Sequence, residues 1–156
     1  MTIFKGEYDC KADVKGRIML PAAFRKQMGE AADFSFVVKR DLYVKCLELY
    51  TVEAWDQLNN WIEKNTKPLN SDHRQFVRDF GMGATEVECD NAGRILIPGR
   101  LLKQAEITNE AVLRGFKGKI EIWSPELYYN SGGDVADKSD RAERIMGDAA
   151  YNSDLL

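Results

Sequence analysis

Two short segments of the chain carry the same polar residues at the same spacing. Each has an aspartate four residues before an arginine, a glycine just before the arginine and a proline four residues after it: Asp13-Val-Lys-Gly-Arg17-Ile-Met-Leu-Pro21 and Asp90-Asn-Ala-Gly-Arg94-Ile-Leu-Ile-Pro98. A planar guanidinium can bridge a phosphate or pair with N7 and O6 of guanine. An aspartate on the same turn can pair with the arginine or bind the local backbone. The spacing alone therefore leaves two interpretations open, an anion-binding surface and a purely structural ion pair.

The similarity of these segments extends on both sides of them, which indicates that the chain consists of two related halves. Aspartate at the first position and glycine at the fourth are typical of a type I turn whose last residue adopts a left-handed backbone. The apolar residues after each arginine predict short strands. Pro21 and Pro98 then predict helices over 22–28 and 99–105. Each half is expected to run strand, turn, strand, short helix and further strands.

Two longer helices are predicted between the repeated turns. Thr51 can cap a helix that runs to about Lys64 with an apolar stripe of Val52, Trp55, Leu58, Trp61 and Ile62. Ser71 or Asp72 can cap a second helix, which ends at Gly81 and packs through Phe76, Val77 and Phe80. Such stripes predict core or subunit contacts rather than a cofactor site.

The composition is that of an ordinary globular chain. With 156 residues, 44% hydrophobic and 30% charged, it can bury a core in one or two small domains. It has neither an apolar run of roughly 20 residues, the length that spans a bilayer, nor an apolar leader followed by a cleavage site. We therefore expect a cytoplasmic protein that does not contact a membrane.

Neither the cysteines nor the other reactive residues indicate catalysis. Cys10, Cys46 and Cys89 are widely spaced and His73 is the single histidine, so no zinc or other metal site is predicted. The thiols are expected to be free and buried. A glycine-rich phosphate loop, a nucleophile elbow and a cluster of metal ligands are all missing from the sequence. The prediction is a protein that is not an enzyme and has no cofactor and no small-molecule substrate.

The two turns, together with Gly6-Glu-Tyr8 and the linking segment Phe80-Gly-Met-Gly-Ala-Thr-Glu86, make the chain resemble MraZ, a family of bacterial transcriptional regulators found with division and cell-wall genes. The resemblance runs from about Phe4 to Tyr128. It implies an α+β fold of two tandem AbrB-like (SpoVT-AbrB type) β-hairpin or barrel halves with pseudo-two-fold symmetry, plus linking helices. The expected parts are a first repeat with its helix at 4–66, a linking helix at 67–83, a second repeat at 84–129 and an acidic tail at 130–156.

The same resemblance implies a function. Members of the family bind short repeats in double-stranded promoter DNA as a ring-shaped, octamer-like homo-oligomer, and usually repress their own operon, so a nucleoid-associated protein is expected. The DNA-binding residues carried over to this chain are Asp13, Arg17, Asp90 and Arg94. Lys15 adds a cation to the first turn where Ala92 stands in the second, so the first turn is expected to bind more strongly. An antitoxin-like or scaffold protein, with a protein partner bound by its tail and DNA secondary, is the alternative.

The charge distribution supports this view in part. The formal net charge of −3 argues against binding to nucleic acid. However, residues 5–26 and 91–119 each carry an excess of lysine and arginine over acidic residues. The acidic tail has one short helix candidate, over 139–146, and is expected to be mobile or to dock on a neighbouring subunit. Its apolar residues could instead anchor it across a subunit interface: Ile145, Met146, Tyr151, Leu155 and Leu156.

Overall fold

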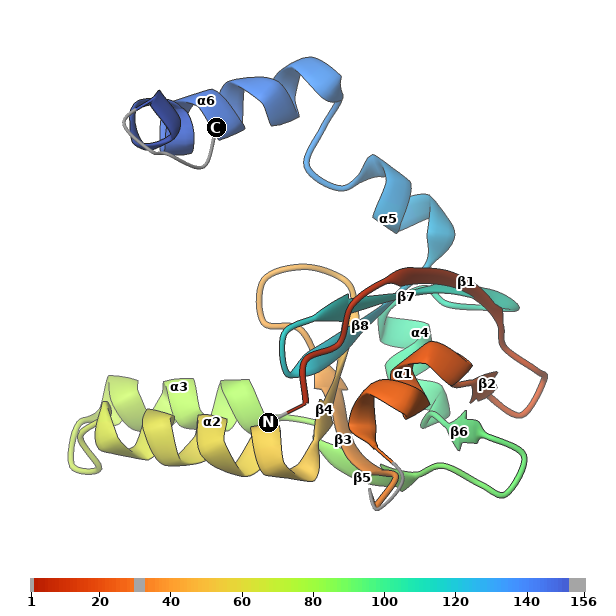
Figure 1. Cartoon of the computed structure of the whole chain (residues 1–156). Helices are drawn as coiled ribbons and strands as arrows, with labels where there is room; N and C mark the ends of the chain where they lie inside the picture. Colours follow the sequence, from red (N-terminus) through yellow and green to blue (C-terminus); the bar gives the residue numbers. More distant parts are fainter. Residues whose placement is uncertain (1, 30–32, 152–156) are drawn as a thin grey trace. The chain divides into compact units, whose positions relative to one another are not determined.

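The computed structural model describes residues 2–29 and 33–151 of the chain. The elements in order are β1 (Glu7–Lys11), β2 (Arg17–Met19), α1 (Ala22–Met28), β3 (Ser35–Arg40), β4 (Leu47–Thr51), α2 (Val52–Lys64), α3 (Ser71–Gly81), β5 (Thr85–Glu88), β6 (Arg94–Leu96), α4 (Gly99–Gln104), β7 (Glu110–Phe116), β8 (Lys119–Trp123), α5 (Pro125–Asn130) and α6 (Val135–Tyr151) (Figure 1). The predicted repetition is confirmed, because β1–β2–α1–β3–β4 is followed by β5–β6–α4–β7–β8. The chain divides into two compact units, Met1–Pro125 and Glu126–Leu156.

The strands of the two halves are interleaved. Six antiparallel strands form one sheet in the order β1-β7-β8-β4-β3-β5, and β2 pairs with β6 in a separate two-stranded sheet. Thus β1 of the first half pairs with β7 of the second, and β5 of the second half pairs with β3 of the first. The α+β prediction is confirmed to the extent that the fold combines helices with antiparallel sheets and contains a repeat. The described strands form no closed barrel, and the assignment to AbrB-like halves stays a prediction.

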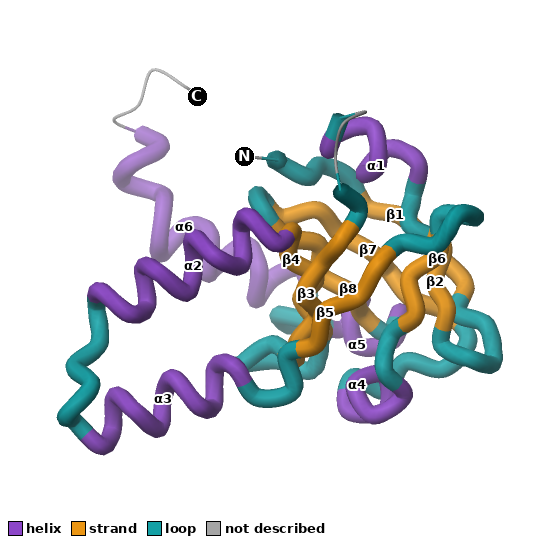
Figure 2. The backbone as a smooth tube through the Cα atoms, turned by 90° about the horizontal axis from the view of Figure 1, so that it is seen from below, coloured by secondary structure: helices purple, strands orange, loops and turns teal. Residues whose placement is uncertain are grey.

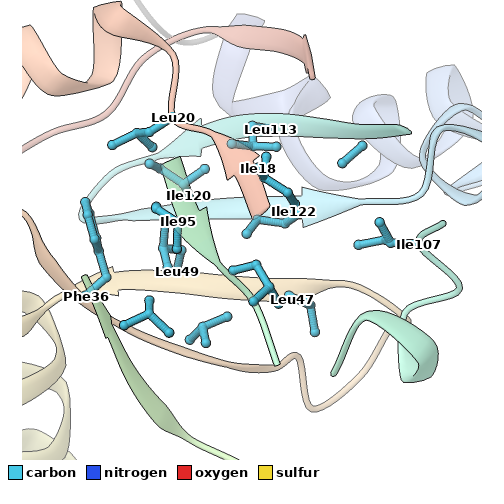
Figure 3. Packing of buried hydrophobic residues seen from close by; sticks show 14 of the residues in the cluster. Ile18, Leu20, Phe36, Leu47, Leu49, Ile95, Ile107, Leu113, Ile120 and Ile122 are labelled. Carbon is cyan, nitrogen blue, oxygen red and sulfur yellow. The ribbon is translucent and has the colours of Figure 1, made fainter. Parts of the chain in front are cut away.

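A pseudo-two-fold axis is visible in the strand register. Ile18 lies opposite Ile95 in the β2–β6 pair, and these two residues are equivalent positions of the two repeats. Alternate residues of a strand face opposite sides of the sheet. The side chains of Ile18 and Ile95 are on the side that faces the larger sheet, and they are therefore buried. Figure 3 shows them beside Leu49, Ile120 and Ile122 of that sheet. The two halves therefore share one hydrophobic core.

The predicted helices are present with small shifts. α1 has the predicted bounds, and α4 ends one residue earlier than expected, at Gln104. Thr51 caps α2 as predicted, since its Oγ1 accepts the backbone N–H of Ala54 at 3.1 Å. The cap of α3 was predicted wrongly: Asn70 is the cap, and its Oδ1 accepts the backbone N–H of His73 at 3.1 Å. An asparagine one residue earlier satisfies the same free N–H groups of the first turn.

The apolar stripes of α2 and α3 are only partly buried within the chain, and the predicted alternative of subunit contacts stays a prediction. The two helices form a hairpin that extends from the sheet (Figure 2). Only Ala54 and Ile62 are buried in α2, and no residue of α3 is buried. At the sheet end Trp55 and Phe80 stack, with ring centroids 5.9 Å apart. The outer part of the hairpin has too few neighbouring elements to cover its apolar residues, and Trp61 is 63% exposed.

The tail contains a longer helix than the sequence predicts. α6 spans Val135–Tyr151, not only 139–146. The backbone N–H of Asp137 donates to Oδ1 of Asp134 at 2.9 Å, and the backbone N–H of Asp134 donates to Oδ2 of Asp137 at 3.0 Å. This reciprocal arrangement is a capping box made by two aspartates, and it lets the helix begin directly after the Gly132-Gly133 pair. Leu155 and Leu156, the last of the suggested anchors, lie outside the described residues.

Candidate nucleic-acid interface

The first repeated turn is held together by Asp13. Its Oδ1 accepts the backbone N–H groups of Lys15 and Arg17, both at 2.9 Å, and its Oδ2 accepts Nε of Arg17 at 2.7 Å. The backbone closes the turn as well, because Gly16 N–H donates to the carbonyl of Asp13 at 3.0 Å. Gly16 has φ +86°, so the predicted left-handed glycine is confirmed. One pair of bridging residues, Ala12 and Ile18, continues the hairpin.

The second turn reproduces this geometry. Oδ1 of Asp90 accepts the backbone N–H groups of Ala92 at 2.9 Å and Arg94 at 2.8 Å, and Oδ2 accepts Nε of Arg94 at 3.0 Å. Gly93 has φ +85° and donates its N–H to the carbonyl of Asp90 at 2.9 Å. The same residue types at the same spacing therefore fold into the same turn twice.

The aspartates are structural anchors of the arginines. Backbone hydrogen bonds from Arg17 and Arg94 are the largest cause that lowers the pKa of Asp13 and of Asp90, respectively, below its ordinary value, so both carboxylates are ionised near neutral pH. Of the nitrogens of each guanidinium, only Nε makes a hydrogen bond to the described residues. The Nη groups of Arg17 and Arg94 are therefore available for an anion. Their side chains are about one-third exposed, at 32% and 37%.

Both arginines lie on the outer face of the two-stranded sheet. Arg17 is opposite Leu96, and Arg94 is opposite Met19. While Ile18 and Ile95 are buried on the inner face, Met19 and Leu96 are 45% and 55% exposed. The two turns leave the body of the first unit on the same side (Figures 1 and 2). Sequence reasoning missed Met19 and Leu96 as surface residues, although strand alternation places them on the same face as the arginines.

Lys15 lies at the tip of the first turn. Its side chain is exposed and makes no ion pair with any residue in the described part of the chain. Ala92 occupies the corresponding position in the second turn, so that tip carries no charge. The predicted residues Asp13, Lys15 and Arg17 thus come together on one turn, and Asp90 and Arg94 on the other.

The cysteines are free, but only Cys46 is buried. Cys10 and Cys89 are half-buried and pack against the hydrophobic core. Cys46 groups with Asp41 and Glu121, and their potential ligand atoms all lie within 4.8 Å of one another. Burial raises the pKa of the Cys46 thiol strongly, which disfavours the thiolate that a metal would need. Asp41 already accepts the backbone N–H groups of Tyr43 and Val44 at 2.7 and 3.0 Å.

In the described part of the chain, every helix is too short or too polar to cross a bilayer.

Two adjacent stretches, residues 3–78 and 80–145, match the family model described as "MraZ protein, putative antitoxin-like". Relatives named "Transcriptional regulator MraZ" cover nearly the whole chain. That of Flavobacterium psychrophilum is 38% identical over 94% of this chain and 94% of its own, and that of Christiangramia forsetii is 39% identical over 94% and 95%. That of Phocaeicola vulgatus is 35% identical over 92% and 94%. Matches of this extent show that the chain belongs to the MraZ family.

Proposed function

We propose that this protein is a transcriptional regulator that binds double-stranded promoter DNA through the outer face of the β2–β6 sheet and its two turns. The observation that carries the proposal is the repeated geometry of Asp13 with Arg17 and Asp90 with Arg94. In each turn a carboxylate fixes Nε of the arginine, while the Nη groups remain available. The relatives' name supports a role in transcription.

The shape of the surface suits the major groove of DNA, which admits a two-stranded β-ribbon. Each guanidinium would bridge a phosphate or pair with guanine N7 and O6. Lys15 would contact phosphate as a point charge. Asp13 and Asp90 would orient the arginines, since a carboxylate on the turn repels the DNA backbone and their oxygens are occupied by hydrogen bonds within the protein.

One chain offers few contacts with DNA, so binding by a single copy would be weak. We propose that the chain acts as a ring-shaped, octamer-like homo-oligomer with AbrB-like halves, as the family resemblance implies, on repeated sites upstream of its own operon. Several linked copies raise the effective concentration of each further turn at a neighbouring repeat. The expected outcome is repression in the cytoplasm, at the nucleoid. Residues 4–66 and 84–129 would form the two DNA-binding repeats joined by 67–83, with residues 130–156 as an accessory tail.

A second candidate function is supported by α6. The side chains of Val135, Ile145 and Met146 are 84%, 65% and 56% exposed, and the family model's description includes the words "antitoxin-like". An antitoxin-like or scaffold protein would use this helix to bind a protein partner, with DNA secondary. Co-purification of a stoichiometric partner that is lost when the residues after Asn130 are removed would favour this alternative.

The proposal is tested by a gel-shift assay with the DNA upstream of the protein's own gene and an unrelated fragment of equal length. We expect a shift of the first fragment at protein concentrations that leave the second one free. The affinity should fall steeply as salt is raised, because each phosphate contact releases counterions. Equal shifts of both fragments would contradict sequence-specific binding, and the absence of any shift would contradict DNA binding itself.

A further inference from the structure

Arg25, on α1 of the first half, lies against the second turn. A Cβ atom placed on Gly93 would be 2.5 Å from Nη1 of Arg25 and 3.0 Å from its Cζ. The guanidinium of Arg25 therefore lies directly against Gly93, in the space that a side chain at position 93 would enter. The sequence places Arg25 far from Asp90 and Arg94, and the crossing arises because β2 pairs with β6 and brings α1 next to the other half's turn.

The first turn has a different neighbour at the equivalent place. A Cβ atom on Gly16 would be 2.9 Å from Cδ1 of Leu102, and Leu102 corresponds to Arg25 in the repeat. Leu102 is 8% exposed and belongs to the hydrophobic core. The pseudo-symmetry thus places an apolar side chain behind one turn and a cation behind the other.

The charge of Arg25 has no partner among the described residues. Its Nε is buried and makes no hydrogen bond to them, and none of the ion pairs in the described ranges includes Arg25. The oxygens of Asp90 are occupied by Arg94 and by backbone N–H groups of the turn. A half-buried, unpaired guanidinium is unfavourable, and an anion bound at the turn would remove this cost.

We propose that Arg25 is a DNA-binding residue of the second turn and contacts a backbone phosphate of the duplex next to Arg94. This inference rests on the proposed DNA binding. Arg25 supplies the cation that Ala92 cannot provide. The first turn then presents Lys15 with Arg17, and the second presents Arg25 with Arg94. The two turns then bind DNA with comparable strength, in place of the stronger first turn that the sequence indicates.

Two substitutions separate the charge of Arg25 from its packing. Arg25→Leu installs the residue type that the first turn has in this place, and Arg25→Gln keeps hydrogen-bond donors without the charge. The matched control is Lys26→Ala, which removes one positive charge from an exposed neighbour on the same helix. Thermal unfolding of each variant shows whether the fold is intact.

Fluorescence anisotropy with a labelled duplex from upstream of the gene, over a series of salt concentrations, measures the effect. We expect Arg25→Leu and Arg25→Gln to weaken binding about 5- to 150-fold per engaged subunit and to reduce the salt slope by about one. Lys26→Ala should change the affinity and the salt slope much less. If a folded Arg25→Leu protein binds like the wild type, or no worse than Lys26→Ala, the inference is wrong while the proposed function stands.

A double-substitution comparison assigns Arg25 to its turn. The effect of Arg25→Leu should be smaller in an Arg94→Ala background, because both residues serve one turn, and additive with Arg17→Ala, because that turn is separate. Additivity with both arginines would contradict the assignment to the second turn. If the unsubstituted protein binds neither the upstream duplex nor an unrelated one, the inference and the proposed function are both wrong.

Discussion

Glu48 lies directly opposite Glu121 in the β4–β8 pair. The two residues are equivalent positions of the repeat, so the pseudo-two-fold axis brings two like charges together. Lys39 Nζ lies 3.2 Å from Oε1 of Glu48, Lys119 contacts Oε2, and the Tyr50 hydroxyl donates to Oε2 at 3.0 Å. Glu48 is buried, and these donors stabilise its charge beside a second carboxylate.

Replacing Lys39 tests this cluster. Lys39→Met should lower the free energy of unfolding by about 3 kcal/mol, because removing one partner of a buried ion pair leaves the other charge poorly compensated. The substitution also removes a cation 4.3 Å from the ring centroid of Phe80, and so loosens α3 from the sheet. Urea unfolding measures the change. Lys45→Met is the control, since its pair with Glu106 is exposed and worth roughly 0–1 kcal/mol; equal effects of the two substitutions would contradict the prediction.

The arginines of the turns should contribute to DNA binding and little to folding. Arg17→Ala should weaken binding by about 1–3 kcal/mol per engaged subunit. With Arg25 at the second turn, Arg94→Ala should cost a similar amount. Anisotropy titrations with the upstream duplex provide the measurement, and thermal unfolding verifies that the variants are folded. Unchanged binding by a folded Arg17→Ala protein would remove this turn from the interface.

The aspartates of the turns should affect stability mainly above acid pH. Hydrogen bonding lowers the pKa of Asp13 in the folded state below its ordinary value of 3.8, which holds in the unfolded state. The contribution of the Asp13 carboxylate to the free energy of unfolding is therefore fully present above pH values near 4. The contribution is lost as the pH falls through the lowered pKa, where the folded state also becomes protonated. Asp13→Asn should therefore be less stable than the wild type at neutral pH, and the difference should shrink below about pH 4.

Unfolding experiments at a series of pH values test this directly. Asp90→Asn should behave in the same way, since the same kind of backbone hydrogen bond lowers the pKa of Asp90. Asp56→Asn, an exposed position on α2, serves as the control for the loss of one carboxylate. A stability difference for Asp13→Asn that stays constant down to strongly acidic pH would show that the carboxylate charge is not what holds the turn.

The tail should be dispensable for the fold of the first unit. The side chains of residues 135–146 are exposed, and the residues up to Pro125 form a compact unit with its own core. A chain that ends at Asn130 should therefore unfold at nearly the same temperature, form the same oligomer and bind the upstream DNA. Light scattering reports the oligomeric state. Monomers of the shortened chain would instead show that Val135, Ile145 and Met146 of α6 form a subunit interface.

The sequence alone was sufficient for the features that depend on near neighbours. The turns at Asp13 and Asp90 and the bounds of α1 and α2 follow from contacts within four residues, and the residue types that make such contacts can be recognised directly. The two turns, Gly6-Glu-Tyr8 and the linking segment Phe80–Glu86 are likewise local patterns, and together they are sufficient to indicate the family. The shorter helix predicted in the tail was an error of the same local kind, since the Asp134–Asp137 capping box was present in the sequence.

The tertiary structure alone decided which half each strand joins and which side chains meet. Because β3 and β7 are repeats of each other, the pattern of β1 fits both, and only packing of the shared core selects β7. The contact of Arg25 with Gly93 and the position of Glu48 opposite Glu121 both follow from the pairing of strands of one half with strands of the other. Local sequence patterns predict the face of an element on which a side chain lies. The packing of the whole core determines which residue, distant in the sequence, that side chain contacts.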